Sequence, residues 1–405
     1  FDEYRKQQLD VLTREQKREL EEHEFVLTKT SKRQLERLGY GINGLYIDDS
    51  SIGFHGRWLV SLSRGKPFNT LIKPGDPIRI DDKNLEGICV RVKESTITII
   101  FDEWPEDPHP GPYRIVRGFN RVSFDRMRSA LDSLDVDNPW YNEMMSSNSG
   151  CAVEMVEMAS LDLKDAGAQA LNTEQVRALT KAVDMLERIT LIHGPPGTGK
   201  TQCISAIIDY LVDKNRDGPL RILICAPSNL AVDNIVERSK HDIIRIGHPC
   251  RLTESVLVKG LDMRVMADDV LKTIKQEMEK IVKLSQKTKS DWAELRALRK
   301  DLRTREARLI NEMLSGKRSI VASTLVGVGS KHMKDLQFDV LIVDEATQAL
   351  DAELWIAIKK VRGKIILVGD HHQLSPMVLD HNKPYIGLFE KLISRDKKSS
   401  SVMLC

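Results

Sequence analysis

The sequence predicts an α/β protein in which helices cover both faces of a parallel β-sheet. Five apolar, β-branched segments in the second half of the chain are separated by helical patterns. None of them alternates apolar with polar residues, which is typical of strands buried on both faces. Shorter strand patterns in the first half, bounded by turn residues, indicate an additional small β-barrel. The five sheet segments are residues 189–192, 222–225, 320–322, 340–343 and 365–368.

Length and composition limit the possible classes of protein. The 405 residues, 41% hydrophobic and 30% charged, suffice for two or three domains. No apolar run approaches the roughly 20 residues of a membrane span, and the charged N-terminus lacks a signal region, so we expect no membrane partner. The six cysteines show no metal-ligand spacing, which predicts free thiols, no structural zinc and a cytoplasmic and/or nuclear location. Because the net charge is only +2, any nucleic acid must be held locally.

The N-terminal residues 1–42 are predicted to form stalk helices. Residues 3–22 are helix formers of mixed charge with sparse leucines, a pattern typical of a long solvated helix. A second helix follows, because Ser31 and Gln34 have capping-box spacing and Gly39 can supply a left-handed stop.

Residues 43–122 are predicted to form the barrel. Glycine, proline and aspartate separate six short strand patterns, and the proline-rich loop 104–112 is too poor in donors to be a central strand. Residues 123–150 are expected to hold a helix that returns beside the stalk, at 123–134, and a serine- and asparagine-rich linker at 139–150. The six strands are expected at residues 44–47, 56–62, 77–80, 87–92, 95–101 and 113–116.

The α/β domain is predicted in two parts, 151–260 and 317–405, separated by a helical insertion at 261–316. Apolar residues recur at helical spacing within the insertion, and a break at 285–290 indicates an antiparallel pair of helices. We interpret it as a packed surface hairpin in preference to a dedicated coiled-coil partner site.

A glycine-rich motif directly follows the first sheet segment and opens a helix. Its spacing is GxxxxGK[ST], in which backbone N–H groups wrap a triphosphate at a helix N-terminus. Lys200 is expected to reach the β- and γ-phosphates, and Thr201 to ligate Mg²⁺. The ATP-binding residues predicted here are Gly194, Pro195, Pro196, Gly197, Thr198, Gly199, Lys200, Thr201 and Gln202.

Two further strand ends carry groups suited to phosphoryl chemistry. An apolar strand ends in Asp344 and Glu345, and such a strand beside the phosphate loop would put Asp344 near Mg²⁺ and let Glu345 polarise the attacking water. Gln373, after the last sheet segment, can sense the γ-phosphate by hydrogen bonding. An acid pair in isolation could equally cap a helix. The neighbouring His371 and His372 lack further ligands at metal spacing, so we do not expect a metal there.

Two polar loops follow other sheet strands. Ser228 and Asn229 come after the second strand, and Ser323 and Thr324 follow the third, so all four are expected at the ligand-facing edge of the sheet. Hydroxyls, amides and free N–H groups there can contact nucleic-acid phosphates without reading bases. Each loop taken alone would be an ordinary turn.

Together, the motifs resemble those of superfamily 1 helicases of the up-frameshift-like group, and most of all the immunoglobulin mu-binding-protein type. The resemblance implies a RecA-like domain, ATP-driven 5′-to-3′ translocation on single-stranded RNA or DNA, Gln175 at the adenine, and Ser228, Asn229 and Thr324 on the nucleic-acid backbone. Gln202 departs mildly, since many members have a small hydroxyl residue there. The motifs that carry the resemblance are residues 171–175, 194–201, 226–234, 244–249, 344–348 and 369–376.

Family members also have motifs that supply arginine fingers from a second RecA-like domain. Those motifs are missing here and Phe1 is no initiator methionine, so we expect a fragment that binds nucleotide but hydrolyses it slowly. The alternative function is a nucleotide-gated clamp that remodels ribonucleoprotein without unwinding. A P-loop kinase or transporter ATPase is disfavoured by Gln175 together with Gln373.

Overall fold

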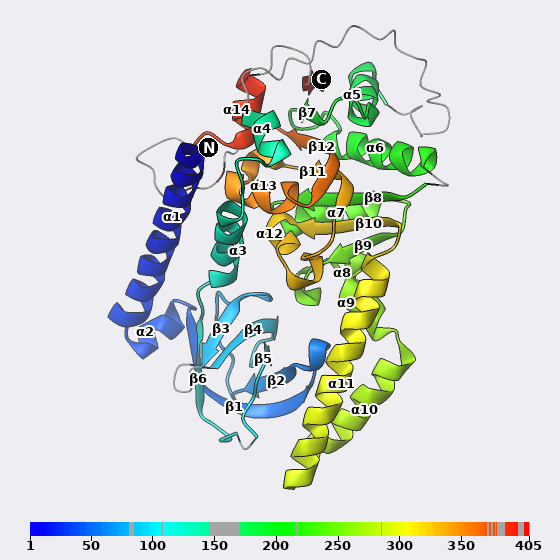
Figure 1. Ribbon diagram of the computed structural model, residues 1–405. Coiled ribbons are helices and arrows are strands. Elements are labelled where there is room, and N and C mark those ends of the chain that lie inside the picture. The colour runs from blue at the N-terminus through cyan, green and yellow to red at the C-terminus, as the bar shows by residue number, and fades with distance from the viewer. Residues whose placement is uncertain are drawn as a thin grey trace.

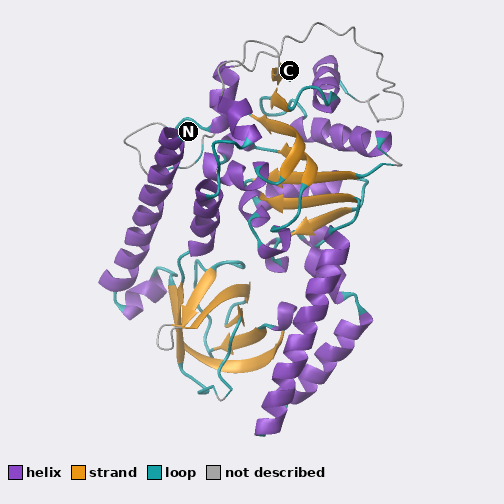
Figure 2. Cartoon of the chain, viewed as in Figure 1, coloured by secondary structure: helices purple, strands orange, loops and turns teal. Residues whose placement is uncertain are grey.

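The computed structural model describes residues 1–80, 85–106, 108–145, 171–215, 218–284, 286–370, 372, 373, 376, 378, 385–395 and 401–404. An α/β layer, a barrel, a helical stalk and a long helical hairpin make up these parts of the chain (Figures 1 and 2). None of the helices in the described ranges has the length and apolarity that crossing a bilayer requires.

A seven-stranded sheet, parallel throughout, forms the α/β layer. All five predicted strands are present. Two short edge strands were not predicted, because three or four residues give too little pattern to recognise. In spatial order the strands are β13 (Ser401–Met403), β7 (Ile189–His193), β12 (Val361–Gly369), β11 (Phe338–Val343), β8 (Leu220–Ala226), β10 (Arg318–Thr324) and β9 (Ile243–Ile246).

Both faces of the sheet are covered, which explains the continuous apolar strands. Alternate strand residues such as Leu223 and Ile224 belong to two different cores. One core includes α5 (Thr173–Val183), α6 (Lys200–Lys214) and α7 (Asn229–Arg238). The other includes α12 (Leu325–Val328), α13 (Asp351–Ile358) and α14 (Leu388–Arg395). The short α8 (Glu254–Leu257) lies beside α7.

Six antiparallel strands close the predicted barrel. Inward residues such as Val60 and Ile99 are fully buried, and the loop 104–112 contains no strand among its described residues. Strand β1 is much longer than predicted. The spatial order is β1 (Gly41–Ile52), β2 (Trp58–Ser63), β5 (Thr96–Phe101), β4 (Leu85–Val92), β3 (Pro77–Ile80) and β6 (Tyr113–Arg117).

The stalk joins the barrel to the α/β layer. Helix α1 (Asp2–Lys29) is followed by α2 (Lys32–Arg37), with the Ser31–Gln34 capping box formed and Gly39 at a φ of 79°. Helix α3 (Arg121–Asp132) returns beside α1 and packs on α13 (Figure 1).

The linker expected at 139–150 begins instead as a helix, α4 (Pro139–Met145). The Asn138 side chain accepts hydrogen bonds from the N–H groups of Trp140 and Tyr141, which starts the helix. Trp140 is buried, and its Nε1 donates to Val361 O at 2.7 Å. Burial of two aromatic rings therefore outweighed the polar composition. The remainder of the expected linker, 146–150, lies outside the described residues.

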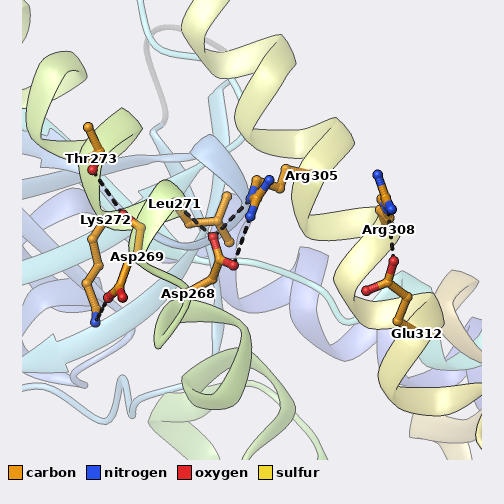
Figure 3. Close-up of polar contacts among 8 residues, drawn as sticks. All are labelled: Asp268, Asp269, Leu271, Lys272, Thr273, Arg305, Arg308 and Glu312. Carbon is orange, nitrogen blue, oxygen red and sulfur yellow. Dashed lines mark hydrogen bonds and ion pairs between the residues drawn. The ribbon is translucent and has the colours of Figure 1, made fainter.

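The insertion forms the expected antiparallel pair, α10 (Asp269–Val282) and α11 (Lys289–Leu314), after α9 (Leu261–Met266). Figure 3 shows how it is fastened: Asp268 caps α10 through Leu271 N and receives both Nε and Nη2 of Arg305 at 2.9 and 3.0 Å. Exposed ion pairs such as Arg308 with Glu312 contribute little to the stability of the hairpin. The hairpin does not stand free, because it lies against the barrel (Figure 1).

Candidate nucleotide site

The glycine-rich loop connects β7 to α6, with Lys200 as the first helical residue. Gly197 and Gly199 both have a φ of 80°, which favours glycine over any other residue. A Cβ on Gly194 would lie 2.8 Å from Thr198 Oγ1 and 2.9 Å from Lys200 Cγ. The loop is therefore folded tightly upon itself at the N-terminus of a 15-residue helix, where the helix dipole favours an anion.

Hydrogen bonds within the loop place its side chains. Lys200 Nζ donates to Gly194 O at 2.8 Å, so the ammonium is held across the loop. Thr198 Oγ1 donates to Pro195 O at 2.8 Å. Thr201 and Gln202 lie in the first turn of α6, and Pro196 is exposed. The nine residues that the sequence predicts to bind ATP thus form a tight loop and the first turn of the helix after it.

Gln175 reaches the same loop from α5. It forms a capping box with Asn172, and its Nε2 donates to Thr198 O at 2.9 Å. A Cβ on Gly199 would lie 2.4 Å from this Nε2. The predicted adenine-binding residue is therefore in contact with the phosphate loop, and glycine at 199 makes that contact possible.

The acid pair lies at the end of β11, but not on the strand next to the loop strand. Strand β12 lies between β7 and β11 in the sheet. Sequence order cannot reveal which parallel strands are neighbours, because each crossover can skip a position. Asp344 is nevertheless close enough to Lys200 for the ammonium to attract its carboxylate, which partly offsets the causes that raise the pKa of Asp344.

The environment of the acid pair suits a divalent cation. Burial, and then the neighbouring Glu345, raise the pKa of Asp344 to about 6, against the opposing effect of Lys200. A metal ion would relieve this crowding of carboxylates. Glu345 has a φ of 51°, unusual for a residue other than glycine, and Gln348 Nε2 donates to its Oε2 at 3.1 Å. The Gln348 amide therefore orients the Glu345 carboxylate.

Gln373 lies four residues after the end of β12. Its Nε2 donates to Asp370 Oδ2 at 2.7 Å, and Asp370 Oδ1 lies 3.7 Å from His193 Nε2. Burial opposes ionisation of Asp370, but hydrogen bonds from His372 N and Gln373 outweigh it and lower the pKa. His193 and His372 pack edge to face, while His371 lies outside the described residues. The predicted sensor is thus tied to the loop strand through Asp370.

The four predicted nucleic-acid residues lie at one edge of the sheet, since Ser323 and Thr324 are in register with Cys225 and Ala226 of β8. Ser228 and Thr324 cap α7 and α12, accepting from Ala231 N and Gly327 N. Ser323 is fully buried, so its hydroxyl is not exposed to a nucleic-acid strand at the surface. Three of the four residues therefore lie where a nucleic-acid backbone could reach them.

The residue that most shapes this edge was not predicted. Arg245 on β9 is fully buried and pairs with Asp233 at 2.8 Å. It also donates to Asn229 Oδ1 at 2.8 Å, which fixes the orientation of that predicted side chain. An arginine in the middle of an apolar strand was the available signal, since buried arginine requires a partner.

A basic groove of about 550 Å³ lies along α11. Arg299 donates to Gly56 O and Asp102 O, and Arg303 to His55 O, so barrel carbonyls orient both side chains without neutralising their charge. Arg296 is paired with Glu106. The groove is lined by Arg296, Arg299, Lys300, Arg303, Thr304 and Ala307.

One residue of the barrel, His55, holds the helical hairpin against the barrel next to this groove. His55 has a φ of 58° and lies between Glu306 Oε2 at 3.2 Å and Asp262 Oδ1 at 3.3 Å. Burial opposes its charge, but hydrogen bonds and attraction to the two acids raise the pKa of His55 to about 9. Its ring also stacks on His332. The charged imidazole thus joins barrel and hairpin at neutral pH.

A phosphate loop between strand and helix, an acid pair that follows a strand two positions away and an amide in the turn after the strand between them define a P-loop nucleotide-binding protein with a RecA-like fold. The chain belongs to the superfamily 1 helicases of the up-frameshift-like group. Residues 170–381 match the AAA domain family, and residues 6–109 match the family described as the 1B domain of helicase SMUBP-2/HCS1.

Curated relatives agree with this assignment. The chain is 32% identical to the DNA polymerase alpha-associated DNA helicase A of Schizosaccharomyces pombe, over 95% of this chain and 63% of that protein. It is 30% identical to the DNA-binding protein SMUBP-2 of Mus musculus, over 96% of this chain and 42% of that protein. The ATP-dependent helicase NAM7 of Saccharomyces cerevisiae is 29% identical over 76% of this chain and 32% of its own length. The chain thus spans less than two thirds of these relatives.

Proposed function

We propose that this protein is the nucleotide-binding part of an ATP-dependent helicase that moves 5′-to-3′ along single-stranded RNA or DNA. The observation that carries the proposal is the joint placement of Lys200, Asp344 and Gln373 around one loop. Each comes from a different strand end, and a structural turn would not need all three.

The chain's own residues divide the chemistry of ATP hydrolysis among them. Loop amides and Lys200 hold the β- and γ-phosphates, while Thr201 and Asp344 would hold Mg²⁺. When bound, Mg²⁺ supplies charge neutralisation between the phosphates. Glu345, oriented by Gln348, accepts a proton from the attacking water. Gln373 moves with Asp370 when the γ-phosphate is lost.

Single-stranded nucleic acid is proposed to cross the sheet edge that holds Ser228, Asn229 and Thr324. The basic groove on α11 supports such a partner, because Arg299 and Arg303 donate only to barrel carbonyls there, keep their positive charge and suit a phosphate backbone without sequence preference. Two of the relatives named above are described as helicases. Their descriptions favour a protein that unwinds duplexes over a clamp that does not. A nucleic-acid partner supports a location in the cytoplasm or nucleus.

The test is phosphate release by the full-length protein with and without single-stranded RNA or DNA, followed by displacement of a labelled strand from a duplex with a 5′ overhang. We expect polynucleotide to stimulate release at least tenfold and Glu345→Gln to abolish it while nucleotide still binds. Stimulated hydrolysis without strand displacement would assign the clamp function instead. No stimulation by either polymer would contradict the proposal.

A further inference from the structure

Asp351 is a fully buried carboxylate outside the nucleotide site. It is the first residue of α13, six positions after Glu345. A charge in such a place is costly unless it is paired and hydrogen-bonded, so the arrangement around it is informative. Three groups donate to its oxygens: Tyr4 Oη at 3.0 Å, Lys391 Nζ at 2.9 Å and Leu388 N at 2.6 Å.

The donors come from segments far apart in the sequence. Tyr4 belongs to the stalk helix α1, while Leu388 and Lys391 belong to α14, which follows the Gln373 motif along the chain. Asp351 itself follows the acid-pair motif. Its carboxylate is therefore the point at which the stalk meets the segments that continue from two of the three phosphate-site motifs.

A second set of bonds repeats the connection one helical turn along α1. Tyr385 Oη accepts from Asp351 N at 2.9 Å and donates to Gln8 Oε1 at 3.2 Å. Trp355 Nε1, also on α13, donates to Tyr4 Oη at 2.9 Å. Gln8 is buried, although a solvated helix has no need of a buried amide.

The chemistry of Tyr4 fits a fixed donor. Burial, and then Asp351, raise the pKa of Tyr4 well above its usual range, so its hydroxyl stays protonated and donates permanently. The Lys391 ammonium lies over the rings of Tyr4 and Tyr385, at 5.6 and 5.8 Å from their centres. Charge, hydrogen bonds and ring contacts thus hold the end of α1 against α13 and α14.

The other end of the stalk contacts the barrel. Helix α1 has 28 residues, so it is about 42 Å long. Near its C-terminal end, the ring of His23 lies 2.8 Å from Arg117 O at the end of β6. Helix α1 runs from the α13–α14 region to α2 and the barrel (Figure 1). A shift of α13 or α14 would therefore be carried along a rigid rod.

We propose that Asp351 is a positioning residue that couples the nucleotide state of the acid-pair and Gln373 motifs to the stalk, and through the stalk to the barrel. The coupling rests on the proposed nucleotide function. A ligand that reorders both motifs changes the distance between α13 and α14, and the Asp351 carboxylate passes that change to Tyr4. Tyr4 and Gln8 are the receiving groups on α1.

Hydrogen–deuterium exchange of this chain, with and without Mg·ATP, tests the coupling. In the wild type we expect Mg·ATP to slow exchange both in residues 189–203 of the phosphate loop and, at least threefold, in residues 2–29 of α1. Tyr4→Phe, which keeps the ring but removes both hydrogen bonds, is expected to retain loop protection and lose the response of α1. Gln8→Met is expected to act in the same direction, which provides a second variant if Tyr4→Phe folds poorly.

Tyr141→Phe is the matched control. Its ring belongs to the same aromatic cluster as Tyr4 and Trp355, but its hydroxyl makes no hydrogen bond among the described residues. The α1 response should survive this change. An α1 segment that ignores Mg·ATP while the loop is protected, or that responds equally in both Tyr4→Phe and Gln8→Met, overturns the coupling alone. A loop that Mg·ATP leaves unprotected overturns the nucleotide site itself.

Discussion

Gln175 Nε2 donates a hydrogen bond to Thr198 O at 2.9 Å, and the Oε1 of the same side chain accepts from Asn172 N at 3.0 Å. One N–H and one lone pair of the amide remain for a ligand. Gln175 can therefore contact a nucleobase without releasing the phosphate loop. Occupancy of the base site and the shape of the loop are linked through this one side chain.

Replacing Gln175 with Glu tests this link. A carboxylate keeps the acceptor for Asn172 N but faces Thr198 O without a donor, so the loop contact becomes repulsive. We expect ATP affinity to fall about tenfold, as for the loss of one to two hydrogen bonds. Affinity for ATP and GTP measured by fluorescence titration checks the result. Unchanged affinity for both would show that Gln175 neither contacts the base nor supports the loop.

Three glycines separate backbone strain from crowding. At Gly197 an added methyl group has open space, so Gly197→Ala is strained only by the positive φ. This change should lower the unfolding free energy by about 1–2 kcal/mol. Gly199→Ala must also displace Gln175 Nε2 from Thr198, so we expect a larger loss of stability and weaker nucleotide binding. Gly218→Ala, with open space and an ordinary φ, is the control and should be neutral. Urea denaturation measures all three; equal stabilities would contradict the loop geometry.

Arg245 and Asp233 form a buried ion pair that supports the sheet edge. Arg245→Met leaves the Asp233 charge without this partner, so we expect the unfolding free energy to fall by about 3–5 kcal/mol. The double variant Arg245→Met with Asp233→Leu should recover part of the loss, because no lone charge is left buried. A double variant no more stable than Arg245→Met would show that the pair is not the cause.

His55 gives the structure a pH dependence of defined sign. Its pKa is raised from 6.5 to about 9 on folding, so its contribution is complete below pH 6.5, decreases as pH rises and is lost above about pH 9. The contribution is roughly 3 kcal/mol. His55→Asn, which tolerates the positive φ, should remove this dependence. Chemical denaturation between pH 6 and 9.5 measures it, and parallel profiles for the two proteins would contradict the assignment.

The features predictable from sequence are those whose residues are adjacent in it. The phosphate loop is eight neighbouring residues after a strand, and the Ser31 capping box spans four, so both were correctly predicted. Tyr4 and Asp351, by contrast, are 347 positions apart, and nothing in either local pattern points to the other. The position of β12 between β7 and β11 is likewise a property of the assembled sheet.

The accessory parts show the same limit. The barrel strands and hairpin helices follow from turn residues and periodicity, but the contact between them depends on His55, Asp262 and Glu306, which belong to three separate elements. Ser323 lies at the predicted edge of the sheet, but its hydroxyl is buried beside Gly327 in the turn that follows, which the pattern of the strand does not reveal.

The most direct test of the account is calorimetric titration of this chain with ATP in the presence of Mg²⁺, for the wild type and Lys200→Ala. In the proposed site Lys200 would donate charge-assisted bonds to phosphate, so we expect saturable one-to-one binding that Lys200→Ala weakens about 10- to 100-fold and that removal of Mg²⁺ also weakens. A wild-type chain that binds no ATP, or a Lys200→Ala variant that binds it equally well, would contradict the central claim.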